Sequence, residues 1–222
     1  LVLCSGFKTE LKKKEKSKAP AGDFSVVGTG ALLLPFIFTV IAIIIQGSLR
    51  DGVTTWMPSY ISETFSLGSD ISILSGVIMP VFAFLCIWAT EYLYYKIKSV
   101  QKCCFMYFSV SFIAALLIPV AVKSGAVLSV FLASLIVGSM HGINILQTCM
   151  LPRSIGNTEQ LGFISGIFNG CVYIGSALST YGFARISEIF GWNGTILVWC
   201  ICSAAGGIIC LCLCKNRRYG KM

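Results

Sequence analysis

A single arginine, Arg50, lies at the end of a long apolar stretch, and its side chain is the first candidate for chemistry. The planar guanidinium of an arginine can hold a phosphate or a carboxylate through two parallel hydrogen bonds. Asp51 follows directly, but neighbouring residues on a helix point to different faces, so we do not expect it to neutralise Arg50 well. The residue types therefore predict a site for a small anion, above all a phosphate.

A second apolar stretch contributes His141, Asn144 and Gln147. A spacing of three residues on a helix gives a slowly spiralling polar stripe. His141 is the one histidine of the chain, and it could donate a hydrogen bond to a phosphate or exchange protons near neutral pH. The alternative is that it forms a hydrogen bond with a neighbouring helix.

Asn169 and Tyr173 lie four residues apart in a third apolar stretch, so they share one helix face and could point into the same cavity. For Asn169, a hydrogen bond between helices is the stronger expectation. Gly162, Gly166 and Gly170 precede them and form two overlapping G-x-x-x-G motifs. Such a stripe lets another helix approach closely, either as static packing or as a sliding surface for a rocking motion.

The composition indicates where these stretches reside. Of the 222 residues, 56% are hydrophobic and 12% charged, with a mean hydropathy of +0.84. A soluble domain carries about a quarter charged residues, so a soluble enzyme, a disordered protein and a nucleic-acid-binding protein are poor interpretations. The net charge of +8 is concentrated in two tails, at 8–18 and 215–221, which is typical of the cytoplasmic face of a membrane protein.

The cysteines predict neither a disulfide scaffold nor a metal site. There are eleven, and most lie inside apolar stretches without a histidine or carboxylate that would complete a zinc shell. We therefore interpret them as small hydrophobic side chains and predict no metal and no cofactor.

Six apolar segments are long enough to cross a bilayer core of about 30 Å, which takes about 20 helical residues. The first begins near residue 29, and the others cover 71–92, 103–122, 126–150, 161–184 and 192–214. The predicted fold class is therefore all-α, a polytopic membrane protein with a six-helix domain over residues 29–214.

The end of the first segment decides how deep Arg50 lies. A span over 29–49 leaves Arg50 at the outer interface, where it would snorkel to water. A span over 34–60 places Arg50 inside the membrane and makes Trp56 and Tyr60 part of the outer aromatic belt. An intramembrane arginine costs at least about 2.5 kcal/mol, so it persists where it faces a polar cavity.

The distribution of basic residues predicts that both termini are cytoplasmic. This orientation places fourteen lysines and arginines inside and leaves two, Lys123 and Arg185, outside. Glu63 and Asp70, in the loop after the first span, fit the outer side. The apolar start Leu1-Val2-Leu3-Cys4 looks like the last turn of an earlier helix. We therefore expect residues 1–28 to be the end of a preceding helix and a cytoplasmic linker, and 215–222 to be a cytoplasmic basic tail.

The residues around Arg50 carry a resemblance to a known family. The run RDGVTTWMPSY at 50–60 resembles the R-x-G-x-x-x-W-x-P-x-Y stretch in helix 7 of the organophosphate:phosphate antiporters. These proteins belong to the major facilitator superfamily and include the glycerol-3-phosphate transporters. YIG at 173–175 and FGWNG at 190–194 resemble that family's Y-x-G in helix 11 and F-G-W-x-G before helix 12. The order and spacing match over nearly the whole chain, as helices 7 to 12.

The resemblance implies one six-helix half of a twelve-helix bundle, with two inverted three-helix repeats and substrate held near mid-membrane between the halves. Arg50 occupies the position that contacts the substrate phosphate in the antiporters, and Tyr173 is implied to contact substrate. The second arginine of that site comes from helix 1, which this chain lacks. His141 stands where the antiporters commonly have an aromatic residue.

Glu91 resembles the acidic residue in the superfamily's loop between helices 8 and 9. It would cap a neighbouring helix or bind a basic residue and so stabilise the outward-open state. The alternative interpretation is a solvated loop carboxylate.

The expected function is secondary transport: the C-terminal half of a carrier that exchanges an organic phosphate, such as glycerol-3-phosphate or a sugar phosphate, for inorganic phosphate across the cytoplasmic membrane. Its expected partners are a small anionic solute, the missing N-terminal half and the lipid bilayer, with no nucleic acid. A membrane enzyme is unfavourable, because no nucleophile–base pair, metal cluster or acidic dyad is present in the spans. A transporter of another small anion or a sugar, and a non-transporting membrane sensor of the same fold, are the alternatives.

Overall fold

The computed structural model describes residues 30–155 and 161–215, and within these ranges it contains helices and short connections but no strand. The chain divides into a unit at 1–34 and a unit at 35–222. Residues 30–34 are the described part of the first unit. The predicted end of a preceding helix and cytoplasmic linker, residues 1–28, lie wholly outside the described residues, as does the basic tail apart from its first residue.

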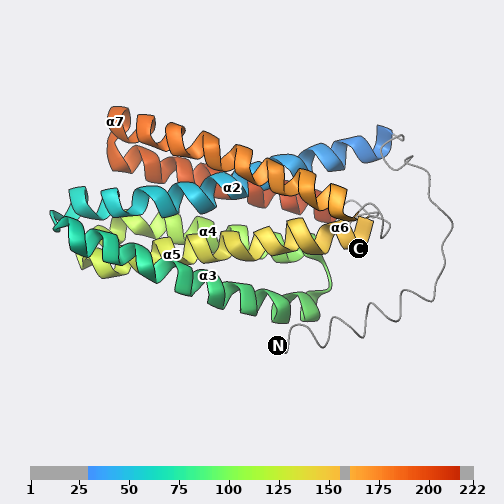
Figure 1. Ribbon diagram of the computed structural model, residues 1–222, viewed down its shortest axis with the longest axis horizontal. Helices are drawn as coiled ribbons and strands as arrows, with labels where there is room; N and C mark the ends of the chain where they lie inside the picture. The colour runs from blue at the N-terminus through green and yellow to red at the C-terminus, as the bar shows by residue number, and fades with distance from the viewer. Residues whose placement is uncertain (1–29, 156–160, 216–222) are drawn as a thin grey trace. The chain divides into compact units, whose positions relative to one another are not determined.

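Five long helices and three short ones make up the described chain (Figure 1). Their bounds are α2 Gly30–Phe65, α3 Ser69–Ile97, α4 Val100–Ala121, η2 Val122–Ser124, α5 Ala126–Ile145, η3 Leu146–Met150, α6 Leu151–Ile155 and α7 Leu161–Lys215. Helices α5, η3 and α6 follow one another without a break. Five apolar segments in these helices are long enough to cross a membrane.

Helix α7 is one of these five segments, and it is long enough for two passages. Its 55 residues would extend about 82 Å at 1.5 Å per residue, far more than a bilayer core of about 30 Å. The helix is interrupted at Gly191, where φ is 67° and ψ is −175°, a backbone conformation that glycine adopts without steric cost. The chain reverses there, as the orange and red parts of α7 show (Figure 1). The prediction of an all-α polytopic protein is confirmed.

Helix α2 is longer than either predicted placement of the first span, because it continues to Phe65. The assignment of Glu63 to a loop is therefore wrong: it lies in the last turns of α2, and its Oε2 accepts a 2.8 Å hydrogen bond from the Trp192 indole. Tyr60 is 1% exposed and its ring meets Trp192 edge-on, so its assignment to a lipid-facing belt is also wrong. Trp56 is half-buried and donates to the Thr180 carbonyl.

Small residues bring α2 and the first half of α7 together, with α2 lying between that helix and α5 (Figure 1). A Cβ on Gly47 would overlap the backbone of Val172, and one on Gly175 would overlap the backbone of Ile44. The two helix backbones are therefore in direct contact. Ser48 adds a 2.9 Å hydrogen bond to the Gly175 carbonyl across the same crossing.

The second half of α7 packs on α4, and α3 packs on α5. The hydroxyls of Ser111 and Ser203 lie 3.0 Å apart between α4 and α7. Cys86 of α3 contacts Gly138 of α5 so closely that a Cβ there would overlap its sulfur. Helix α5 lies beside α2 as well, since the Gln46 Nε2 of α2 donates to the Met140 carbonyl of α5.

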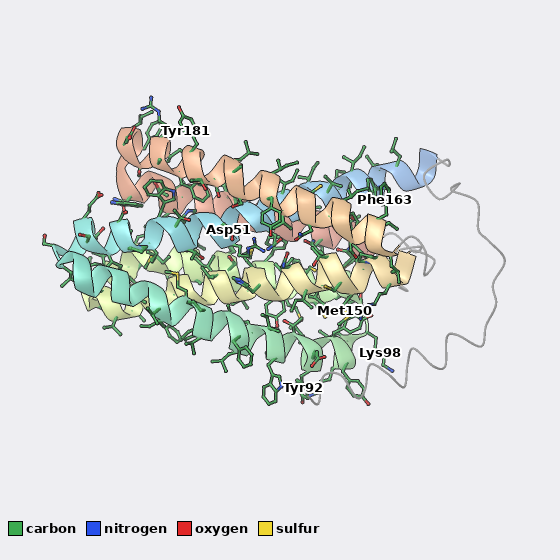
Figure 2. The ribbon with its side chains drawn as sticks, in the orientation of Figure 1. Asp51, Tyr92, Lys98, Met150, Phe163 and Tyr181 are labelled. Atoms are coloured by element: carbon green, nitrogen blue, oxygen red, sulfur yellow. The ribbon has the colours of Figure 1, made fainter. Side chains whose placement is uncertain are left out.

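The outward faces of the helices are apolar. Phe84, Trp88 and Val127 are 71%, 72% and 85% exposed. Figure 2 shows labelled side chains such as Tyr92, Phe163 and Tyr181 projecting from the helices. Exposed apolar surface this extensive is the property of helices that face lipid.

Candidate functional site

Helix α2 carries Arg50 about halfway along its membrane-length segment, Leu33–Phe65. The Arg50 side chain is 13% exposed, and the helix is continuous on both sides of it. Arg50 therefore lies within an apolar helix rather than at its end. This position agrees with the longer of the two predicted spans.

Asp51 is the direct partner of Arg50. The Arg50 Nε donates to Asp51 Oδ1 at 2.6 Å, and Nη2 donates to Oδ2 at 2.8 Å. The expectation that Asp51 would not neutralise Arg50 well is wrong, because both of its carboxylate oxygens accept hydrogen bonds from the guanidinium. The pair is side-on and bidentate, which is the strong form of this interaction, and its net charge is zero.

Two further helices contribute polar groups to this ion pair. Ser176 on α7 lies beside the Asp51 carboxylate, close enough for its hydroxyl to act on it. His141 on α5 is close enough to interact electrostatically with both Arg50 and Asp51. Figure 2 shows Asp51 among the helices of the unit. The candidate site therefore lies where α2, α5 and α7 meet.

His141 is half-buried and bonds within its own helix. Its Nδ1 lies 2.9 Å from the Val137 carbonyl oxygen. A carbonyl only accepts, so the Nδ1 nitrogen carries the proton in this bond and Nε2 is left for other contacts. The alternative expectation of a bond to a neighbouring helix is not met within the described chain.

Several amide groups near this site are buried without a hydrogen-bond partner among the described residues. They are Oε1 of Gln46, Oδ1 of Asn144 and both amide atoms of Gln147. The Gln46 Nε2 donates to the Met140 carbonyl at 3.1 Å, which joins α2 to α5. An unpaired buried polar group costs about 1–3 kcal/mol, so these amides hold hydrogen-bonding capacity that the described fold does not use.

The wide turn η3 carries Gln147 and begins two residues after Asn144. In this π turn the Leu151 N–H donates to the Leu146 carbonyl, five residues back. Pro152 lacks an N–H and cannot donate to the carbonyl of Thr148, which favours a break in the regular pattern. Single π turns inside α-helices occur frequently at functional sites.

Tyr173 and Asn169 do not join Arg50 in the structure. Tyr173 is 61% exposed, and Asn169 is exposed on the same helix. Val172 and Gly175, on either side of Tyr173, face α2, so the Tyr173 side chain points away from that contact. Neither side chain forms a hydrogen bond within the described chain, and the helix–helix bond expected for Asn169 is not formed there. Their contact with substrate stays a prediction.

The glycine stripe on α7 has open space beside it. A Cβ on Gly162, Gly166 or Gly170 would meet nothing within 4 Å. No helix in the described part of the chain packs on this stripe, so its role as a packing or sliding surface stays a prediction. The close approaches that do occur use Gly47 and Gly175.

Glu91 is exposed on α3 and forms no ion pair with any residue that the structure describes. The neighbouring Lys96 lies 4.6 Å from the centre of the Tyr92 ring instead. The predicted capping or gating role of Glu91 stays a prediction. Within the described ranges, no three His, Cys, Asp or Glu side chains come together in a way that suits a metal ion.

Sequence reasoning missed three members of the site: Asp51 as a partner, Ser176 and Gln46. Asp51 was considered as a partner of Arg50 but was judged a poor one, because adjacent residues on a helix point to different faces. Gln46 precedes Arg50 by four residues, the spacing that places two side chains on one helix face, and this signal could have identified it. Nothing in the sequence distinguishes Ser176 from the other serines of α7.

A family model described as the Major Facilitator Superfamily matches residues 1–180. The chain belongs to the major facilitator superfamily. It is accordingly a multi-pass membrane transport protein, and members of this superfamily are generally transporters rather than enzymes. A comparison with curated proteins finds no match. Transporters of the superfamily hold substrate near the bilayer midplane, which is where a side chain halfway along α2 would lie.

Proposed function

We propose that this chain is the C-terminal half of an antiporter that exchanges an organic phosphate, such as glycerol-3-phosphate or a sugar phosphate, for inorganic phosphate by alternating access. The observation that supports this most is the guanidinium of Arg50 halfway along α2. Its side chain is 13% exposed and is oriented by Asp51, the next residue on the same helix. A charge in this position is costly and marks a substrate pathway by default.

The hydrogen-bonding geometry of Arg50 supports a phosphate as ligand. Its Nε and Nη2 already hold two carboxylate oxygens at 2.6 and 2.8 Å, and a phosphate presents two oxygens in the same way. His141 and Asn144, on the helix that faces Arg50, would add hydrogen bonds. Tyr173 and Asn169 would reach the ligand from the exposed face of α7.

The proposal includes a second six-helix half as partner. That half would cover the exposed face of α7 that carries Asn169, Tyr173 and the glycine stripe, and Glu91 would act at the inner end of α3. The whole carrier would reside in the cytoplasmic membrane with both termini in the cytoplasm, since the basic residues cluster on that side. It would need no cofactor, would bind no nucleic acid and would catalyse no reaction.

The test replaces Arg50 in the full-length protein. Arg50→Lys keeps the positive charge but cannot hold two oxygens in parallel, so phosphate uptake into vesicles loaded with glycerol-3-phosphate should fall about 10- to 100-fold. Arg185→Lys is the matched control, because Arg185 forms an exposed ion pair with Glu188 on α7 and uptake should stay normal. Near-normal uptake by the Arg50→Lys protein would contradict the proposal.

A neutral sugar is the second candidate substrate, and the zero net charge of the Arg50–Asp51 pair favours it. The pair offers donors and acceptors side by side, which suit the hydroxyl groups of a sugar. Competition separates the two: a neutral hexose that blocks uptake, with no effect of inorganic phosphate, would favour the sugar.

A further inference from the structure

We infer that Asp51 is a built-in competitor of the substrate anion, which occupies the binding edge of Arg50 and must be displaced before a phosphate can bind there. This inference rests on the proposed function. It concerns how strongly the same site holds its ligand, and so how readily the ligand leaves.

The geometry of the pair carries the inference. Both Asp51 carboxylate oxygens are bonded to the Nε–Nη2 edge of the guanidinium, at 2.6 and 2.8 Å. That edge is the one a side-on phosphate would use. A phosphate that approached the other edge, Nη1–Nη2, would still meet the carboxylate close by, and like charges repel strongly where water is scarce. Asp51 therefore opposes the anion on either edge.

The Asp51 carboxylate has other polar groups beside it that it can bind when it is displaced from Arg50. The Ser176 hydroxyl on α7 lies beside the carboxylate, so it can donate a hydrogen bond to Asp51 once the carboxylate leaves Arg50. His141 on α5 is the remaining charged or titratable group that interacts with Asp51. Both groups come from helices other than α2, so the displaced carboxylate would be held against α7 and α5.

The competition lowers the apparent affinity for the anion. A site that is free for only a fraction of the time binds with an apparent Kd equal to the intrinsic Kd divided by that fraction. An exchanger has to release each substrate before it can take the next, so an internal competitor speeds release at the expense of affinity.

The test compares binding of radiolabelled inorganic phosphate to full-length proteins in detergent. Asp51→Asn keeps the shape of the side chain and removes its charge, so phosphate should bind about tenfold more tightly, as for a site that was free about one tenth of the time. Phosphate exchange across vesicles should become slower at the same time. Glu188→Gln is the matched control, since it removes the acid of an exposed arginine pair and should leave binding unchanged.

A second variant keeps the test decisive if Asp51→Asn does not fold. Ser176→Ala leaves the ion pair intact and removes the hydroxyl that would hold the displaced Asp51 carboxylate. Because displacement then costs more, phosphate binding should weaken several-fold. Unchanged binding by this protein would then overturn the inference.

The outcomes separate this inference from the proposed function. If Arg50→Lys loses phosphate binding while Asp51→Asn binds phosphate as the unaltered protein does, or more weakly, Asp51 is not a competitor and the proposed function stands. If Arg50→Lys binds phosphate normally, the proposed function itself fails, and the inference fails with it.

Discussion

A small group of polar side chains lies among apolar helices, and their partners define what they can do. Arg50 is paired with Asp51, whereas the buried amide atoms of Gln147 have no partner in the described chain. The first arrangement is an ionic contact that a phosphate would have to break in the proposed mechanism. The second leaves hydrogen-bonding groups that a ligand or water would satisfy. Only the second arrangement is the exception in folded proteins, where buried polar groups are normally hydrogen-bonded.

Replacing His141 tests its contribution to anion binding. The Nδ1 proton is used by the Val137 carbonyl, which leaves Nε2 for other contacts, and the ring interacts electrostatically with both members of the ion pair. His141→Phe, which restores the aromatic residue common in the antiporters, should raise the apparent KM for phosphate about tenfold, the typical worth of a hydrogen bond to a charged group. The measurement is phosphate uptake over a range of concentrations.

His141→Gln provides the matched variant, because its amide can still donate. It should retain more affinity than His141→Phe. Equal KM values for all three proteins would show that His141 only supports the helix.

At the scale of the helices, the apolar segments were well predicted and their ends were not. The segments at 103–122 and 126–150 lie almost entirely within α4 and within the run of α5 and η3, because an apolar run of membrane length leaves few alternatives. The end of α2 was missed, since Glu63 looks like a loop residue until Trp192, distant in sequence, supplies its partner. Contacts between distant residues are not contained in local patterns.

The crossing of α2 and α7 depends on Gly175. A Cβ there would overlap the Ile44 backbone, and backbone cannot rotate away as a side chain can. Gly175→Ala should therefore destabilise the protein by about 1–3 kcal/mol, the usual range for overpacking. The measurement is the midpoint of thermal unfolding in detergent.

Gly166→Ala is the control on the same helix, since a Cβ there meets open space within the described chain. It should leave this chain, studied alone, as stable as before. A loss of stability only in the presence of the second half that we propose would identify the glycine stripe as a surface for that half. A Gly175→Ala protein that unfolds at the normal temperature would contradict the direct backbone contact.

For the whole molecule, the sequence was sufficient for the class and insufficient for the geometry of the site. Composition and six apolar segments predicted a polytopic helical protein, and the family match agrees. Arg50 was identified as a candidate binding residue because it is a charged residue in an apolar stretch. Tyr173 was assigned to the substrate site by resemblance, yet its side chain points away from α2. The side chain that is bonded to Arg50 in the structure is that of Asp51. Which groups meet depends on side-chain torsions and helix rotation, which residue spacing constrains only loosely.

The orientation in the membrane gives a prediction at this scale. Lys98, between α3 and α4, should be cytoplasmic, and Gly125, before α5, should be external, because fourteen basic residues then lie inside and two outside. Alkaline phosphatase, active only outside the cytoplasm, should be active when fused after Gly125 and inactive after Lys98. The reverse pattern of phosphatase activity would show that the topology is opposite to the predicted one.

The reversal at Gly191 makes the assembly of the last two passages depend on one backbone torsion. Trp192 resumes the helix at once, so the two passages form a tight helical hairpin with no loop between them. A side chain at this φ of 67° and ψ of −175° would add about 1–3 kcal/mol of steric strain and disfavour the reversal. Without the reversal, α7 would be a single rod too long for the bilayer core. One glycine thus returns the carboxyl end of α7 toward the side on which the helix begins.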